Sequence, residues 1–443
     1  MAEEGTPDTR EGGVRASVSL LRRNRDFRRA YLSSLISLGG DWFLLVALFG
    51  LVLDLTHGSP LALSFLFAAQ DLTYFLVSPF AGVLADRLDR KRVMIGADIA
   101  RALLCLGLLF ARTDGVVWIV YPLLAVMACF SAAFEPASAA ALPNLVDDED
   151  LATANALSGS LWGTMLAVGA AIGGLVTAAL GRDVAITVDA VSFVGSALLI
   201  MRVQRSFQES RGARAPEPLG EAAKETVRYA RRDHRVLALL VVKFGWGLAG
   251  GVLVLIPLLA KGRFHAGEVG IGLLLAARGV GAVIGPFIGR AALGSKDRRL
   301  FLAIGIALGV FGIGYALLGI VPSLLLAMLA VALAHTGGGA QWMLSSYGLQ
   351  KIVPDHIRGR IFAFDGMLVT LTFGTSSVLT GWLAETFDPR TTAIAMGAVA
   401  VIWAAAWMWL TTDVRRATLM DGCGGPPPES YVSVEERSGP TEP

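Results

Sequence analysis

Residues 82–93 read GVLADRLDRKRV, a dense charged turn between two long apolar runs. Gly82 would permit close contact between helices, and Asp86 could face the positive end of a helix dipole. Basic side chains would hold the turn at the cytoplasmic surface of a membrane, and these are Arg87, Arg90, Lys91 and Arg92. The alternative interpretation is an ordinary loop whose positive charge only sets membrane orientation.

The composition of the chain indicates an integral membrane protein. Of its 443 residues, 54% are hydrophobic and 17% charged, and the mean hydropathy of +0.60 excludes an ordinary soluble enzyme. A helix that crosses a bilayer needs roughly 20 apolar residues, and about twelve such runs are present. The predicted spans are 28–53, 61–84, 93–111, 117–142, 156–180, 184–201, 236–259, 267–289, 300–320, 322–349, 361–385 and 391–412.

The distribution of basic residues predicts the orientation of these spans. If both termini are cytoplasmic, about 30 of the 38 Lys and Arg residues lie inside the cell. The loops that would then lie outside carry only Arg112, Arg182, Lys261, Arg263 and Arg390. We therefore expect a multi-pass protein of the inner (plasma) membrane with both termini in the cytoplasm.

A polar segment near the middle divides the chain into two sets of about six spans. Residues 138–151 (SAAALPNLVDDEDL) and 345–358 (SSYGLQKIVPDHIR) occupy matching positions in the two sets, as in repeats related by an axis along the membrane normal. Convergent composition could produce the same match. The predicted parts are a cytoplasmic N-terminal tail (1–27), a six-helix bundle (28–202), a cytoplasmic linker (203–235), a second six-helix bundle (236–412) and a disordered cytoplasmic tail (413–443).

The linker has a basic region that allows two interpretations. Residues 221–232 could form a surface helix against anionic headgroups, or the segment could be a solvated linker.

Several motifs carry a resemblance to a known family. Residues 82–94 resemble the loop between the second and third helices of the major facilitator superfamily. Further segments are similar to its drug-efflux branch, which includes macrolide exporters and the enterobactin exporter: NRDFR at 24–28, GGDW at 39–42, FEPA at 134–137, LPNLV at 142–146, AN at 154–155, Gln350, VP at 353–354 and RGR at 358–360. The resemblance covers about residues 20–415. It implies twelve transmembrane helices in two six-helix bundles and proton-coupled export of a lipophilic small molecule.

Two departures from the family pattern bear on the mechanism. Residues 169–174 (GAAIGG) are similar to the motif of exporting members, but Ala170 stands where proline is usual. The glycines would still allow close helix packing. The fourth span has no arginine at the position that the family associates with proton transfer, and Arg101 in the third span could substitute for it.

Charged residues inside the spans are the candidates for proton coupling, because a charge in hydrocarbon is costly and normally faces a partner or a watery cavity. These candidates are Asp41, Asp71, Glu135, Asp98 and Arg101. Asp98 and Arg101 are three residues apart and could instead form a local ion pair that serves packing. Glu135 could instead make a structural hydrogen bond to a neighbouring helix. Asp189 lies near the outer end of its span, which favours a solvated structural role.

A second group of residues could line a substrate cavity at the midplane between the two bundles: Trp42, Tyr74, Arg278, Lys243, Gln341 and Trp342. Membrane aromatic residues also face lipid or pack helices, so each allows that simpler explanation. Gly337, Gly338 and Gly339 could form a gating bend or allow close helix packing.

Enzymatic and metal-dependent functions have little support in the sequence. It has no phosphate loop of the Walker type, and its five histidines show no metal-binding spacing. We expect a monomeric secondary transporter with no cofactor and no metal, whose partners are a small-molecule substrate, protons and membrane lipid, but not nucleic acid. Residues Gly82, Asp86, Arg87, Arg90 and Lys91 would form a conformational-switch loop, with Asp86 facing a helix end of the other half. Alternatives are an exporter of an endogenous metabolite or siderophore, bound through Arg278 and Lys243, and a transport-inactive membrane sensor or lipid-handling protein.

Overall fold

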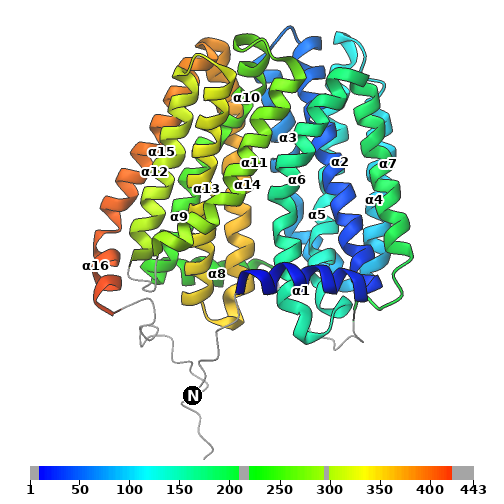
Figure 1. Ribbon diagram of the computed structural model, residues 1–443. Coiled ribbons are helices and arrows are strands. Elements are labelled where there is room, and N and C mark those ends of the chain that lie inside the picture. The colour runs from blue at the N-terminus through cyan, green and yellow to red at the C-terminus, as the bar shows by residue number, and fades with distance from the viewer. Residues whose placement is uncertain (1–8, 209–218, 294–298, 422–443) are drawn as a thin grey trace, which may run out of the picture.

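The computed structural model is all-helical over the residues that it describes, 9–208, 219–293 and 299–421 (Figure 1). Side chains are described within these ranges apart from those of residues 9–14, 81–87, 219–223, 355–356 and 417–421. The predicted all-α membrane fold is confirmed.

The first half of the chain forms helices α1 (Thr9–Arg23), α2 (Arg25–Leu55), α3 (Pro60–Arg87), α4 (Arg90–Leu108), η1 (Asp114–Ile119), α5 (Val120–Leu145), η2 (Asp148–Asp150), α6 (Leu151–Leu180) and α7 (Arg182–Met201). After α8 (Leu219–Arg232), the second half forms α9 (His234–Gly250), η3 (Gly251–Val254), α10 (Leu255–Leu258), η4 (Leu259–Arg263), α11 (Gly267–Leu293), α12 (Leu300–Ile320), α13 (Leu324–Ile352), α14 (Asp355–Thr386), α15 (Pro389–Leu410) and α16 (Thr412–Asp421).

Eleven helical segments within the described ranges are long and apolar enough to cross a membrane. The predicted third span, residues 93–111, corresponds to α4, which falls short of that standard because its 19 residues include five charged ones. Asp98 and Arg101 of α4 are buried against other helices, so they do not face lipid. Eleven of the twelve predicted spans are therefore confirmed by their length and composition. The remaining one, α4, lies beside the other helices in the same bundle.

Helices α2 to α7 lie on one side of the molecule and α9 to α15 on the other (Figure 1). We call these two sets the first half and the second half. Helices α1 and α8 lie across the same end of the molecule, here called the α1 end; the opposite end is called the far end. The domain boundaries at 28–202 and 236–412 stay a prediction.

The two tails contain more helix than the sequence suggested. Helix α1 lies within the predicted N-terminal tail, and α16 covers the start of the C-terminal tail. The prediction of disorder from residue 413 is therefore wrong as far as Asp421, because Arg415 donates a hydrogen bond of 2.6 Å to the carbonyl of Met408 and so ties α16 to the end of α15. Residues 422–443 of that tail lie outside the described residues.

The two halves approach most closely where α6 packs on α11 and α3 packs on α14. A Cβ atom added to Gly174 on α6 would lie 3.0 Å from the Cα of Gly272 on α11, so only glycine allows this approach. The other glycines of the 169–174 motif pack α6 on α2. A Cβ atom added to Gly169 would lie 3.2 Å from Trp42, and one added to Gly173 would lie 3.0 Å from Phe43. The motif works as a packing surface without the usual proline.

Residues 337–339 also serve packing. Helix α13 runs without interruption through the three glycines. A Cβ atom on Gly338 would lie 3.0 Å from the indole nitrogen of Trp246, and one on Gly339 would lie 2.9 Å from the carbonyl oxygen of Ala282. These contacts favour close helix packing over a gating bend.

Candidate functional site

A cavity of about 580 Å³ lies between the two halves. Most of its lining comes from α2, α3, α5 and α6 of the first half, and the second half contributes Leu253, Arg278 and Phe373. Toward the α1 end the lining continues to Phe27 in the first turn of α2 and Leu145 at the end of α5. The cavity therefore extends from the middle of the molecule toward the α1 end.

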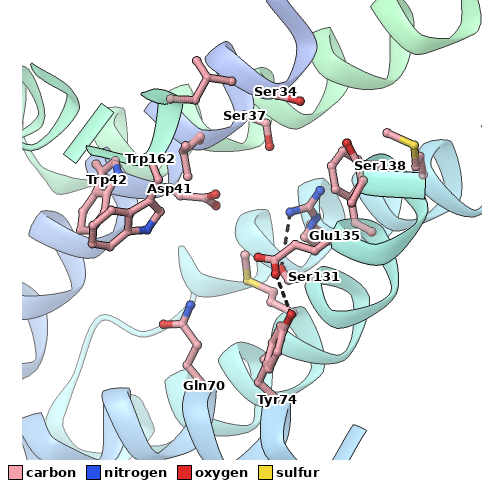
Figure 2. Close-up of a pocket in the computed structure, with 18 of the residues that line it drawn as sticks. Ser34, Ser37, Asp41, Trp42, Gln70, Tyr74, Ser131, Glu135, Ser138 and Trp162 are labelled. Atoms are coloured by element: carbon pink, nitrogen blue, oxygen red, sulfur yellow. Dashed lines mark hydrogen bonds between the residues drawn. The ribbon is translucent and has the colours of Figure 1, made fainter. Parts of the chain in front are cut away.

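Carboxylates face this cavity from three helices. Asp41 on α2 and Glu135 on α5 point into the same space (Figure 2). Glu135 accepts a hydrogen bond of 2.6 Å from the hydroxyl of Tyr74 on α3. Among the described side chains, Asp41 and Asp71 have no hydrogen-bond or ion-pair partner. The predicted hydrogen bond between Glu135 and a neighbouring helix is therefore present, with Tyr74 as the donor, while the Glu135 side chain still reaches the cavity.

Arg101 lies in the cavity wall, and a neighbouring carboxylate neutralises its positive charge. It forms an ion pair with Asp98, which is fully buried and accepts a hydrogen bond of 2.6 Å from Ser196 on α7. The guanidinium lies between two rings, 4.7 Å from the centroid of Phe134 and 4.4 Å from that of Phe193. The local ion pair predicted from the spacing of Asp98 and Arg101 is therefore present. It fixes the position of Arg101 while leaving it in contact with the cavity.

Aromatic rings and one further cation complete the middle of the cavity. The rings of Trp42 and Trp162 meet edge to face with centroids 6.1 Å apart. Arg278 from α11 places its guanidinium 5.5 Å from the centroid of Trp162. Its Nε atom is buried and has no hydrogen-bond partner in the described part of the chain. Asp71 and Arg278 line the same cavity without forming an ion pair.

Three of the predicted cavity residues lie elsewhere in this conformation. Lys243 is 1% exposed, forms an ion pair with Asp365 and lies 3.1 Å from the hydroxyl of Ser346. Its ammonium also lies 4.6 Å from the ring centroid of Trp342. Gln341 is fully buried, and its amide has no partner among the described residues. The second half therefore holds Lys243 and Gln341 in its interior and Trp342 at its surface. The described cavity lining includes none of the three.

Asp189 differs from its predicted solvated environment. Its side chain is fully buried. Its carboxylate accepts hydrogen bonds from Ser192, at 3.2 Å, and from the thiol of Cys105, at 3.5 Å. Asp189 was expected to be solvated because it lies near the end of its span, but α2 also packs against it: a Cβ atom added to Gly40 would collide with its Oδ1.

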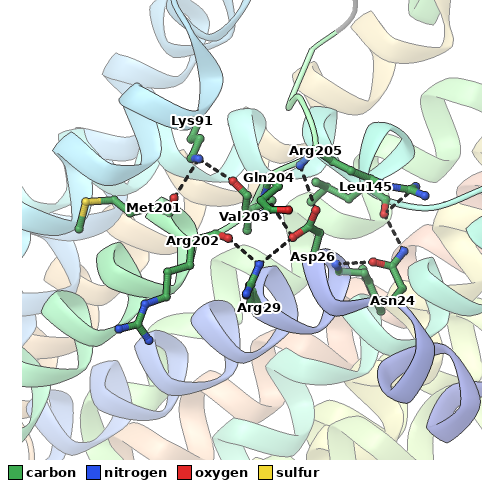
Figure 3. Close-up of polar contacts among 11 residues, drawn as sticks. Asn24, Asp26, Arg29, Lys91, Leu145, Met201, Arg202, Val203, Gln204 and Arg205 are labelled. Carbon is green, nitrogen blue, oxygen red and sulfur yellow. Dashed lines mark hydrogen bonds and ion pairs between the residues drawn. The ribbon is translucent and has the colours of Figure 1, made fainter.

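The charged turn at 82–93 is anchored within the first half. Helix α3 continues to Arg87, and the side chains of Gly82, Asp86 and Arg87 lie outside the described residues. Arg90 donates hydrogen bonds to the carbonyls of Ala140 (2.9 Å) and Phe207 (3.3 Å). Lys91 donates to the carbonyls of Met201 (3.0 Å) and Val203 (2.7 Å), as Figure 3 shows. The switch role of this loop stays a prediction.

A polar network at the α1 end involves the NRDFR motif (Figure 3). The side chain of Asn24 accepts a hydrogen bond from the backbone N–H of Phe27, which caps α2, and donates one of 2.8 Å to the carbonyl of Leu145. Asp26 accepts hydrogen bonds from the backbone N–H groups of Gln204 and Arg205. The motif therefore ties the start of α2 to the ends of α5 and α7.

Several neutral polar residues of the cavity were not predicted from the sequence. They are Ser34, Ser37, Gln70, Ser131 and Ser138 (Figure 2). For the serines, the available signal was a regular helical spacing: Ser34, Ser37 and Asp41 on α2 are three and four residues apart, and Ser131, Glu135 and Ser138 on α5 are four and three residues apart.

A cavity lined by carboxylates, hydroxyls and indoles between two helical halves is typical of a membrane transporter. The family model described as "transmembrane secretion effector" matches residues 17–441. The chain belongs to this family of major facilitator transporters.

Curated relatives in this family agree with the sequence resemblance. The uncharacterized MFS-type transporter YfiS of Bacillus subtilis (strain 168) is 31% identical, over 42% of this chain and 44% of its own length. A protein named as bacilysin exporter BacE from Bacillus amyloliquefaciens is 27% identical, over 78% of this chain and 85% of its own length. Macrolide efflux protein A of Streptococcus pyogenes is 26% identical, over 74% of this chain and 82% of its own length. The chain is therefore a transporter of the efflux type and not an enzyme.

The fold also matches solved transporter structures. A bacterial homolog of the human lysosomal transporter Spinster, crystallised in an inward-facing and unoccupied conformation, has a TM-score of 0.70 and 15% identity to this chain. The match covers 91% of this chain and 99% of the other, and at this identity it shows the fold alone.

Proposed function

We propose that the protein exports a lipophilic small molecule with a basic nitrogen in exchange for protons, by alternating access of the cavity to the two sides of the membrane. The unpartnered carboxylates of Asp41 and Asp71 in the cavity carry this proposal. A carboxylate at this depth in a membrane is costly unless a proton or a cation accompanies it. Protons and a cationic substrate would therefore compete for the same groups.

The cavity has the chemistry of a site for amphiphilic cations. Asp41, Asp71 and Glu135 provide negative charge, and the indoles of Trp42 and Trp162 provide apolar faces that also attract cations. Arg101 adds no net charge to this region, because Asp98 neutralises it.

The direction of transport follows from orientation and from the relatives. Both termini would be cytoplasmic, because basic residues are concentrated at the α1 end, as in Arg22, Arg23, Arg25 and Arg28. The cavity would then extend toward the cytoplasm in this conformation, ready to bind substrate there. The names of two relatives, an exporter and an efflux protein, support export.

The competition supplies a coupling mechanism. Substrate bound from the cytoplasm would displace protons from Asp41 or Asp71, and protonation from the outside would release the substrate after the halves rock. Asp71 on α3 and Arg278 on α11 lie in opposite halves and line the same cavity, so rocking could bring them into an ion pair in the other conformation.

An anionic substrate is the second candidate, because Arg278 lines the cavity and forms no ion pair with the described residues. Lys243 would not assist it in this conformation, since Asp365 holds its charge away from the cavity. Three carboxylates face the cavity against this one uncompensated cation, and they favour the cationic substrate.

Transport into inverted membrane vesicles with an acidic interior tests the proposal. The panel would contain lipophilic cations, macrolides and siderophore-like anions, with vesicles that lack the protein as the blank. We expect a cation or macrolide to accumulate, and the accumulation to collapse with a protonophore and in Asp41→Asn. Asp148→Asn is the matched control, because Asp148 is exposed in η2 and its side chain does not line the cavity.

Other outcomes would redirect the assignment. Accumulation of an anion that depends on Arg278 and not on Asp41 would support the metabolite or siderophore alternative. Accumulation that persists without a proton gradient would contradict proton coupling. If folded protein accumulates no compound, the sensor or lipid-handling alternative gains support.

A further inference from the structure

Four charged residues meet at the far end of the molecule, where the two halves touch. Asp54 at the end of α2 and Arg182 at the start of α7 belong to the first half; Lys261 in η4 and Glu268 at the start of α11 belong to the second. We call these four residues the far-end quartet. Their side chains are between 18% and 49% exposed, so water and salt reach the site.

Each charge of the quartet contacts both opposite charges. Between the halves, Arg182 lies 2.7 Å from Glu268, and Lys261 lies 2.6 Å from Asp54. Within the first half, Arg182 also contacts Asp54. Within the second half, Lys261 lies 3.5 Å from Glu268. The quartet is therefore electrically neutral as a whole, and each half of it is neutral as well.

The local backbone is adapted to bring these side chains together. Lys261 lies in η4, a π-helical turn, and such turns are rare and concentrate at functional sites. Gly50 on α2 leaves the space that the quartet uses, because an added Cβ would lie 2.7 Å from Oε1 of Glu268 and 3.0 Å from Nε of Arg182. One turn beyond Glu268, the close approach of Gly174 and Gly272 holds the backbones of the two halves together.

We propose that the far-end quartet is a partner-exchange latch. Its two ion pairs between the halves hold the far end closed. When the far end opens, each charge keeps its partner within its own half. Separation of the halves removes the contacts from Arg182 to Glu268 and from Lys261 to Asp54. Arg182 then keeps Asp54, and Lys261 keeps Glu268, so no charge is left without a partner. Opening is therefore less costly than breaking two isolated ion pairs, while closure remains specific.

This inference rests on alternating access, as set out under the proposed function, but it does not depend on the identity of the substrate. It predicts that reversing both charges of one half keeps that half neutral and puts like charges opposite each other at the interface. The far end should then open. Reversing the charges of both halves should restore the attraction and close it again.

Distances between two spin labels at the far end test this prediction. The labels replace Trp118 in η1 and Leu325 in α13, which are exposed and lie in different halves, in a protein whose three native cysteines are changed to alanine. We expect Asp54→Lys/Arg182→Glu and, separately, Lys261→Glu/Glu268→Lys to raise the ratio of far-end-open to far-end-closed molecules by roughly tenfold. The combined fourfold variant should return that ratio to the value of the unreversed protein.

A matched control reverses another ion pair at the same end. Arg112 and Asp183 lie 2.8 Å apart, and both belong to the first half, so Arg112→Glu/Asp183→Arg should leave the distances unchanged. The difference between the half-reversed and unreversed proteins should also shrink at 1 M salt, where the screening length falls to about 3 Å.

The outcomes separate the latch from the transport mechanism. If substrate or pH changes the label distance in the unreversed protein but neither half reversal does, the latch is wrong and alternating access stands. If the half reversals open the far end and the fourfold variant stays open, partner exchange is also excluded. If no condition changes the distance in any variant, alternating access itself is contradicted.

Discussion

The hydroxyl of Tyr74 on α3 donates a hydrogen bond of 2.6 Å to Glu135 on α5, which gives this carboxylate a donor that Asp41, facing the same cavity, lacks among the described residues. The two carboxylates therefore differ in their environment although both reach the cavity. Glu135 is held in place by a neighbouring helix, and Asp41 is available to a ligand or a proton.

Substitution at Glu135 should separate charge from hydrogen bonding. Glu135→Gln can still accept the hydrogen bond from Tyr74 but removes the negative charge, so we expect unchanged folding and a roughly tenfold weaker affinity for a cationic substrate. Tyr74→Phe keeps the charge and should retain affinity, at a cost of about 1 kcal/mol in stability. Binding titrations and thermal unfolding of the purified variants measure both effects. Loss of affinity in Tyr74→Phe alone would show that the hydroxyl, and not the carboxylate, binds substrate.

The contact between Gly174 and Gly272 should control closure of the far end. Gly174→Ala places a methyl group against the backbone of α11, so we expect α6 and α11 to separate and the far end to open more often. The rate at which a thiol reagent labels Ser64→Cys reports this opening, because Ser64 is fully buried at the contact of α3 with α14. Gly159→Ala on the same helix is the control, since its added methyl group would meet no atom within 4 Å. Equal labelling rates in the two variants would contradict the prediction.

The ion pair of Lys243 and Asp365 should matter for stability when only one partner is removed. Lys243→Met leaves the carboxylate of Asp365 buried without a cation, which should destabilise the protein by about 3–5 kcal/mol. The double variant Lys243→Met/Asp365→Leu should recover most of this loss, because it leaves no unpaired charge. Thermal unfolding in detergent compares the three proteins. A double variant as unstable as the single one would point to a role of Lys243 beyond the pair.

Three substitutions at Asn24 should dissect the network at the α1 end. Asn24→Ala removes the cap of α2 and should cost about 1 kcal/mol. Asn24→Asp keeps the acceptor for the N–H of Phe27 but loses the donor to the carbonyl of Leu145, and Asn24→Ser likewise keeps only the cap. We therefore expect the stabilities of the Asp and Ser variants to lie between those of the Ala variant and the unchanged protein. If all three variants unfold at the same temperature, the cap does not contribute.

Hydropathy predicted most of the fold because a membrane span has a simple physical requirement. The predicted span 300–320 coincides with α12, which carries no charged residue. Helix α1 was missed because its 15 residues are mostly polar, so hydropathy gives no signal there; it packs against α2 and α6 at the end of the bundle.

The candidate site was harder to predict, because side-chain partners are set by packing between distant segments. Asp41 and Asp71 were chosen as charges inside membrane spans and Arg278 as a cavity candidate, and all three line the described cavity. Lys243 was a cavity candidate too, but Asp365, 122 residues away in sequence, pairs with it inside the second half. Asp189 was misjudged for the same reason, since the thiol and hydroxyl groups that cover it come from its own helix and from α4.

The two halves contribute unequally to the cavity lining. Three lining residues come from the second half, and all the others come from the first half or, in the case of Phe207, from the segment that follows it. Substrate preference can therefore diverge among related exporters through substitutions in α2, α3 and α5, while the surfaces of the second half that pack and move against them are preserved. In a chimera of two such exporters, the parent that donates the first half would determine which compounds confer a growth advantage on the cell.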